Sequence, residues 1–177
     1  MSFDGMAEQA AGFKFDPPGL DRDRFLVENR AALSGPGVRG FLAIADLWDL
    51  GEQDKIAILG YPGRSTFHKW AREARNGKPM RLSVDTLCRI SAILGIHKTL
   101  GILYLMPEEG PQWLRLPNRG PLFGGQRPLD LILSGTMDGI MQVRRYLDAQ
   151  RGGQFAAPTT APFEHEPWRA DDVVIVE

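Results

Sequence analysis

Apolar residues along much of the chain recur at intervals of three and four, the spacing that places them on one face of an α-helix. This pattern predicts a helix that starts at residue 39 and is ended by Gly51, with an apolar face made by Phe41, Leu42, Ile44, Ala45, Leu47 and Trp48. Further helices are predicted over 52–59 and 65–75. Gly60-Tyr61-Pro62-Gly63 is predicted to form the turn between them, and Asn76-Gly77 to cap the end of the latter helix.

The same reasoning divides the second half of the chain into four more helices. Ser83 is a good N-cap for a helix over 84–94 that Gly95 stops, and another helix is predicted over 97–105. A short helix over 128–133 precedes a last helix over 137–150, whose apolar stripe is Ile140, Val143 and Leu147. The only candidate strand is the run at 173–176, which suits pairing with the sheet edge of another chain.

The predicted fold class is therefore all-α with irregular N- and C-terminal arms. Prolines and glycines punctuate the first 38 residues, including Gly35, Pro36 and Gly37, so only 21–33 allows a short helix there. We expect an N-terminal arm over 1–38, a helical domain over 39–106, a small helical module over 107–153 and a C-terminal tail over 154–177.

Composition narrows the class of protein. Of the 177 residues, 43% are hydrophobic and 24% charged, with a formal net charge of −1, so the whole-chain balance favours neither nucleic acid nor membrane. A single cysteine, Cys88, excludes an internal disulfide framework and fits a reducing compartment. The N-terminus does not look like a secretory signal, and no uncharged apolar stretch approaches 18 residues. These features predict a soluble, cytoplasmic protein.

The average charge hides a basic centre. Residues 52–98 carry nine Lys and Arg against four Asp and Glu, whereas residues 1–51 carry five against eight. Two short helices joined by a glycine-containing turn, over 52–75, are the helix-turn-helix arrangement. At about 100° per residue, Phe67, Trp70, Ala71 and Ala74 fall on an inward arc, while the opposite arc is polar and largely basic.

A polar, basic helix face suits insertion into a DNA major groove, because Arg and Lys neutralise phosphates and reach guanine edges. The alternative is an ordinary solvated face. The residues predicted to contact DNA are Arg64, Ser65, Thr66, His68, Lys69, Arg72 and Arg75.

Candidate catalytic chemistry is absent from the pattern. The histidines at 68, 97 and 165 are isolated, Cys88 lies on an apolar helical face, and Gly124-Gly125 lacks the spacing of a phosphate-binding loop. We therefore expect no enzyme activity, cofactor or metal.

Residues 113–151 contain an ordered set of short motifs: Trp113, Pro117-Asn118, Gly124-Gly125, Pro128-Leu129-Asp130, Gly135 and the helical stripe from Val143 to Leu147. This set resembles the toxin-binding domain of the Xre/MbcA/ParS antitoxin family. The preceding stretches "GRSTFHKW" and "LSVDTLCRISAILG" are similar to that family's Xre-like helix-turn-helix region, so the resemblance covers roughly residues 40–153.

The resemblance implies an antitoxin of a type II toxin-antitoxin system. Its partner would be a RES-domain toxin that degrades NAD, encoded in the same operon and blocked by direct binding at its active site. It also implies a homodimer that represses its own operon through the helix-turn-helix. The residues assigned to toxin binding are Arg115, Asn118, Arg119, Gly124, Gly125, Arg127, Arg144, Arg145 and Trp168.

Two alternatives remain open at this point. In the first, the chain neutralises a toxin but does not bind DNA. In the second, it is a helix-turn-helix transcriptional regulator whose C-terminal module serves dimerisation only. Both ends depart from the compact family pattern, since the arm is long and the tail extends past the usual end of the module.

Overall fold

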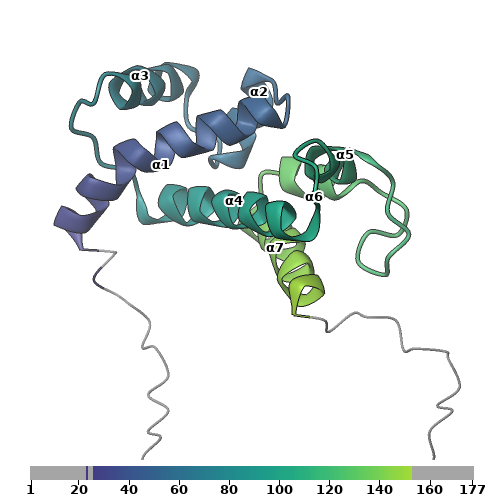
Figure 1. The fold of residues 1–177 in the computed structure, drawn as a ribbon. Helices are drawn as coiled ribbons and strands as arrows, with labels where there is room; N and C mark the ends of the chain where they lie inside the picture. The colour runs from purple at the N-terminus through teal and green to yellow at the C-terminus, as the bar shows by residue number, and fades with distance from the viewer. Residues whose placement is uncertain (1–22, 24–25, 153–177) are drawn as a thin grey trace, which may run out of the picture. The chain divides into compact units, whose positions relative to one another are not determined.

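A computed structural model describes residue 23 and residues 26–152 of the chain. The described residues form seven α-helices and no strand. They are α1 (Val27–Leu47), α2 (Glu52–Ile58), α3 (Arg64–Arg75), α4 (Val84–Leu103), α5 (Glu109–Arg115), α6 (Pro128–Leu133) and α7 (Met137–Arg151) (Figure 1). The all-α prediction is confirmed. The predicted strand at 173–176 and Trp168 lie outside the described residues.

The chain divides into two compact units between Ser91 and Ala92, a boundary that falls within α4. In the first unit, α1 packs against α3 and α2 lies beside the C-terminal end of α1 (Figure 1). Phe41, Ala45 and Trp48 of α1 and its C-cap are 0–1% exposed, and they supply much of this core. Arg39 ties α1 to α3 by donating from Nη1 to the carbonyl oxygen of Ala74 at 2.9 Å.

Helix α1 is longer than its sequence predicts, because Gly35, Pro36 and Gly37 do not interrupt it. An internal proline removes a backbone hydrogen bond and usually kinks or breaks a helix. Here the buried Ser34 Oγ donates to the Arg30 carbonyl oxygen at 2.6 Å and accepts from the Leu82 backbone N–H at 2.9 Å. The hydrogen bond from Leu82 is a tertiary contact that anchors α1 two residues before Pro36, and the prediction that the helix begins at residue 39 is wrong.

The end of α1 also differs from the prediction. Asp49, with φ at 51°, takes the left-handed position that terminates the helix, and Gly51 instead precedes α2. Leu50 donates its backbone N–H to the Ala45 carbonyl oxygen and Asp49 donates to that of Asp46, the hydrogen bonds of a Schellman motif. Because α1 stops at this point, Leu47 is 64% exposed and is not a core residue.

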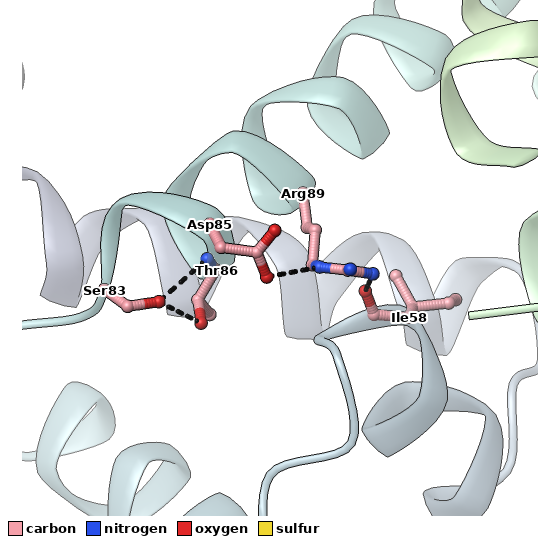
Figure 2. Close-up of polar contacts among 5 residues, drawn as sticks. All are labelled: Ile58, Ser83, Asp85, Thr86 and Arg89. Carbon is pink, nitrogen blue, oxygen red and sulfur yellow. Dashed lines mark hydrogen bonds and ion pairs between the residues drawn. The ribbon is translucent and has the colours of Figure 1, made fainter. Parts of the chain in front are cut away.

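Helix α4 is continuous where the sequence predicts two helices separated at Gly95. Its N-terminus is as predicted, since Ser83 Oγ accepts from the Thr86 backbone N–H at 3.1 Å (Figure 2). Gly95 stays helical, and the guanidinium of Arg144 occupies the space beside it. Among the described helices α4 has the length and hydropathy of a membrane span, a criterion that core helices of soluble proteins also meet. About 39% of its apolar window is buried, including Ile93, Ile96 and Leu100.

The second unit contains the end of α4, the unpredicted helix α5, and the predicted helices α6 and α7. Helix α6 packs against both α5 and α7 around a core made by Leu114, Ile132, Ile140, Val143 and Leu147. Gly139 allows close packing, because a Cβ there would lie 2.3 Å from the Leu131 carbonyl oxygen. The hydroxyl of Thr136 accepts from the Gly139 backbone N–H at 3.0 Å and caps α7.

Candidate functional site

The turn between α2 and α3 is built by backbone conformation. Gly60, with φ at 87°, donates to the Ala57 carbonyl oxygen, and Tyr61 donates to that of Ile56. This is again a Schellman motif, and it ends α2 and turns the chain toward Gly63, the N-cap of α3. The predicted turn is therefore confirmed.

Arg89 of α4 supports this turn from inside the first unit. Its Nη1 donates to the carbonyl oxygen of Ile58 at 3.4 Å, and its Nε pairs with Asp85 at 2.6 Å (Figure 2). A Cβ on Gly60 would lie 3.0 Å from Arg89 Nε, so the glycine provides both the left-handed φ and the room for this arginine. The Arg89 side chain is 11% exposed, which leaves it as a fixed element of the turn and not a surface cation.

Helix α3 has the two faces that the sequence predicts. Phe67, Ala71 and Ala74 are buried and Trp70 is half-buried. Of the predicted DNA contacts, Thr66 is half-buried, and the other six are exposed: Arg64, Ser65, His68, Lys69, Arg72 and Arg75. The structure thus brings these six side chains together on one solvent-facing side of α3. Their contact with DNA stays a prediction.

Two acidic side chains contact this basic face. Glu52, the first residue of α2, places Oε1 2.6 Å from Arg64 Nε and Oε2 3.4 Å from His68 Nε2. Glu73 lies 3.9 Å from Lys69 at an i,i+4 spacing. The sequence pattern does not single out Glu52, because its partners on α3 lie 12 and 16 positions away on a different helix, and such spacings show no periodicity.

Tyr61 in the turn before α3 is a further residue that the sequence pattern does not single out. It has φ at 57°, an unfavourable conformation for a bulky residue, and its side chain is 64% exposed in the turn just before α3. A glycine would adopt this conformation without strain. The tyrosine at this position is therefore a candidate for the same surface as the α3 cations.

In the second unit, a loop from 116 to 127 joins α5 to α6, and three aromatic rings hold it. The rings of Phe123 and Tyr146 meet edge to face, with their centroids 4.9 Å apart. The Trp113 ring lies edge to face with Phe123 at a centroid distance of 5.9 Å, and it stacks on Tyr146 at a centroid distance of 6.1 Å. Trp113 and Phe123 thus anchor the loop, and Tyr146 brings α7 into the cluster.

The loop backbone is closed on itself. Asn118 donates its backbone N–H to the Gln126 carbonyl oxygen at 3.0 Å, and Gly125 donates to the Asn118 carbonyl oxygen at 2.8 Å. Gly124 and Gly125 have φ at 56° and 90°, with nothing within 4 Å of a Cβ at either position. Glycine is needed there for conformation and not for space, so the loop presents an exposed backbone turn at 124–125.

The arginines assigned to toxin binding have different surroundings. Arg127 donates from Nε to both carboxylate oxygens of Asp130, at 3.1 and 3.0 Å, and its backbone N–H donates to Oδ2 at 3.2 Å. The side-chain hydrogen bond from Arg127 is the main cause that lowers the pKa of Asp130. The same pairing raises the pKa of Arg127. Arg127, the N-cap residue, and Asp130 in the first turn thus cap the N-terminus of α6.

Arg144 is held within the second unit. Its Nε donates to Asp148 at 2.8 Å, and Asp148 also accepts from the buried Thr99 hydroxyl at 3.1 Å. By contrast, Arg119 and Arg145 are exposed, and neither side chain has a hydrogen bond or an ion pair with another described residue. Arg115 is exposed as well, but it does have a partner.

A hollow of about 270 Å³ lies beside the aromatic cluster, lined by Leu103, Tyr104, Trp113, Tyr146, Leu147 and Gln150. Burial, followed by the neighbouring Tyr146 and Glu109, raises the pKa of Tyr104, so this side chain stays neutral and can donate its hydroxyl proton. Leu105 and Met106, which follow α4, are 95% and 60% exposed. Exposed apolar side chains beside an aromatic hollow are typical of protein-binding surfaces.

No group of three or more His, Cys, Asp or Glu side chains able to hold a metal ion occurs among the described residues. The surfaces described above are built from cations, aromatic rings and backbone turns. Over the residues that the structure describes, the fold is all-helical, with a helix-turn-helix in one unit and a small helical module in the other.

Comparison with known proteins agrees with this class. Residues 106–153 match the family model of the antitoxin Xre/MbcA/ParS C-terminal toxin-binding domain. A 116-residue stretch, 66% of the chain, is 45% identical to the uncharacterized protein y4oB of Sinorhizobium fredii (strain NBRC 101917 / NGR234) and covers 84% of that protein. The chain belongs to the Xre/MbcA/ParS antitoxin family, and the match supports an antitoxin role with a toxin as partner.

Proposed function

We propose that this chain is the antitoxin of a type II toxin-antitoxin system. It neutralises a RES-domain, NAD-degrading toxin of the same operon by direct binding that obstructs the toxin's active site. The observation that carries the proposal is that the family match over 106–153 coincides with the loop held by Trp113, Phe123 and Tyr146. A rigid loop binds with a small entropy cost, because little of it must be ordered on association.

Within that segment, the toxin-binding surface combines two parts. The exposed turn at Gly124-Gly125 and the exposed Arg119 provide polar contacts, and the hollow beside Trp113 accepts an apolar side chain of the toxin. Arg145 adds a second cation for toxin carboxylates. Asn118, Arg115, Arg127 and Arg144 remain in the proposed surface, and the contacts of Arg127 and Arg144 inside the unit suggest that they mainly shape it.

The second part of the proposal is autorepression by a homodimer bound to operator DNA through α3. It is supported by six exposed polar side chains on one side of a helix that a tight turn presents. In this scheme the protein acts in the cytoplasm, has no catalytic activity of its own and needs no cofactor.

The test is co-expression of this chain with the protein encoded beside it, purification through a tag on the toxin, and measurement of cellular NAD. A stable complex, with NAD falling only when this chain is absent, is the expected result. A toxin that is captured and neutralised without any effect on NAD would keep the antitoxin role and reject the RES assignment. Absence of both complex and rescue would leave the alternative of a transcriptional regulator.

A further inference from the structure

Glu52 is an unusual neighbour for a DNA-binding face, because it brings a negative charge to a surface that would meet phosphates. Its two carboxylate oxygens contact two different side chains of α3, Arg64 at 2.6 Å and His68 at 3.4 Å. These two residues are four positions apart and lie on the same face of the helix. We propose that Glu52 is a specificity-determining residue of the DNA interface, which it serves by fixing the positions of Arg64 and His68. The inference rests on the proposed DNA binding.

The geometry at Arg64 leaves the DNA-reading end of its side chain available. Glu52 is bound through Nε, the nitrogen closest to the backbone, so the four terminal N–H groups of the guanidinium remain as donors. The side chain of Arg64 is 76% exposed, and it starts α3, the end of a recognition helix that approaches base edges. An arginine held at Nε loses fewer rotamers when it forms paired hydrogen bonds to a guanine.

Glu52 is itself well placed for this role. It is the first residue of α2, where the positive end of the helix dipole favours a carboxylate. Its side chain is 36% exposed, about half the exposure of Arg64, so it stands behind the arginine relative to solvent. As an exposed pair it adds little to the stability of the fold. Glu52 instead orients the side chains of Arg64 and His68, and its negative charge weakens the attraction of this surface to DNA phosphates whatever the base sequence.

These two effects separate in a binding experiment. Glu52→Gln removes a negative charge, so affinity for unrelated DNA rises, while the loss of a strong acceptor for Arg64 and His68 lowers affinity for the operator. The ratio of operator to unrelated affinity is expected to fall about fivefold or more, since one well-placed base contact is worth roughly 1–3 kcal/mol of discrimination. A residue that acts by charge alone would change both affinities by the same factor and leave the ratio unchanged.

The experiment uses the full chain and fluorescence anisotropy with two labelled duplexes, one from its own upstream DNA and one of the same composition in scrambled order. Glu52→Asp, which keeps the charge but shortens the side chain, is expected to lower the ratio as well. The matched control is Asp46→Asn, which breaks a 2.6 Å ion pair with Lys55 outside α3 and should leave the ratio unchanged. In an Arg64→Ala background, Glu52→Gln should lower the ratio much less.

The outcomes are distinguishable. A fall in the ratio with Glu52→Gln, absent in Asp46→Asn, supports the positioning role, provided that far-UV circular dichroism shows both variants folded. An unchanged ratio overturns it while the proposed DNA binding stands. A wild-type protein that binds both duplexes equally would reject operator recognition itself, and with it any specificity role for Glu52.

Discussion

The guanidinium of Arg144 lies in the space that a side chain on Gly95 would occupy: a Cβ at Gly95 would be 1.5 Å from Arg144 Nη1. The two residues belong to α4 and α7, and the contact is fixed by the bond from Arg144 Nε to Asp148. Gly95 is therefore retained inside a helix, where glycine costs about 1 kcal/mol relative to alanine. In return α7 lies close to α4 in the second unit.

A double-mutant cycle tests this relationship. Gly95→Ala alone should change the free energy of unfolding little, because the gain in helix propensity is offset by displacement of the Arg144 side chain and its pairing with Asp148. In an Arg144→Ala background no guanidinium is displaced, so the same substitution should stabilise by about 1 kcal/mol. Urea unfolding followed by circular dichroism measures both values. Equal changes in the two backgrounds would contradict the packing described.

Asp130 makes the stability of the start of α6 depend on pH. Arg127 lowers the pKa of Asp130 in the folded state. The charged pair therefore stabilises the fold fully above the ordinary pKa of aspartate, and this stabilisation is lost as the pH falls through the lowered pKa. Asp130→Asn should lower the stability of the second unit by about 0.5–1 kcal/mol at neutral pH, since this pair is partly exposed. Thermal unfolding at pH 7 and at acid pH measures the difference. It should shrink at acid pH, and persistence of the full difference there would argue against a charge effect.

Replacement of Tyr61 should raise the stability of the first unit and lower its affinity for operator DNA. Because its φ of 57° suits glycine, Tyr61→Gly should stabilise the first unit by about 0.5–1 kcal/mol. If the exposed ring belongs to the proposed DNA surface, operator affinity should fall in the same variant. Thermal melts and anisotropy on one preparation give both results. A variant that is stabilised but binds DNA as the wild type does would place Tyr61 outside the DNA surface, and a variant that is not stabilised would contradict the strain at this position.

Much of the molecule could be predicted from local sequence. The faces of α3, the Gly60 turn, the Asn76-Gly77 cap, and helices α6 and α7 follow from periodicity and capping residues that act within a few positions. Leu129 and Ile132 of α6 are buried, while Trp113 and Leu131 are half-buried. The continuity of α1 and α4 could not be predicted, because Ser34–Leu82 and Gly95–Arg144 are contacts between residues about 50 positions apart that no local pattern contains.

The same limit applies to the candidate surfaces. Exposed cations were identified by residue type alone, which gives Arg119, Arg127 and Arg144 the same weight. Arg127 and Arg144 pair with Asp130 and Asp148 at i,i+3 and i,i+4 spacings, a local signal that could have set them apart from the exposed Arg119. The pairing of Glu52 with Arg64 and His68, by contrast, depends on tertiary geometry. Helix α5 was missed because its seven residues include Gly110 and Pro111, a pair that is typical of turns and loops.

The basic face of α3 is tested by Lys69→Ala combined with Arg72→Ala. Each residue that contacts a phosphate releases counterions on binding, so the double variant should weaken operator binding and reduce the slope of log K against log salt by up to about 2. Toxin neutralisation should be unaffected. Lys98→Ala with Arg151→Ala removes the same charge from exposed positions in the second unit and serves as the control. Wild-type affinity of the first double variant across salt concentrations would show that α3 is not the recognition helix.

Toxin binding and operator binding should be separable, because the two proposed surfaces lie in different units. Arg119 is exposed on the closed loop, and among the described residues it has no ion pair whose loss would disturb the fold. Arg119→Glu should raise the dissociation constant for the toxin at least tenfold, because a reversed charge facing toxin carboxylates is repelled. Operator binding should be retained. Arg72→Glu is the mirror control and should lose operator binding while cells remain protected from the toxin. If Arg119→Glu protects cells and binds toxin as tightly as the wild type, the loop between α5 and α6 does not form the toxin contact, and the hollow beside Trp113 becomes the part of the surface to test.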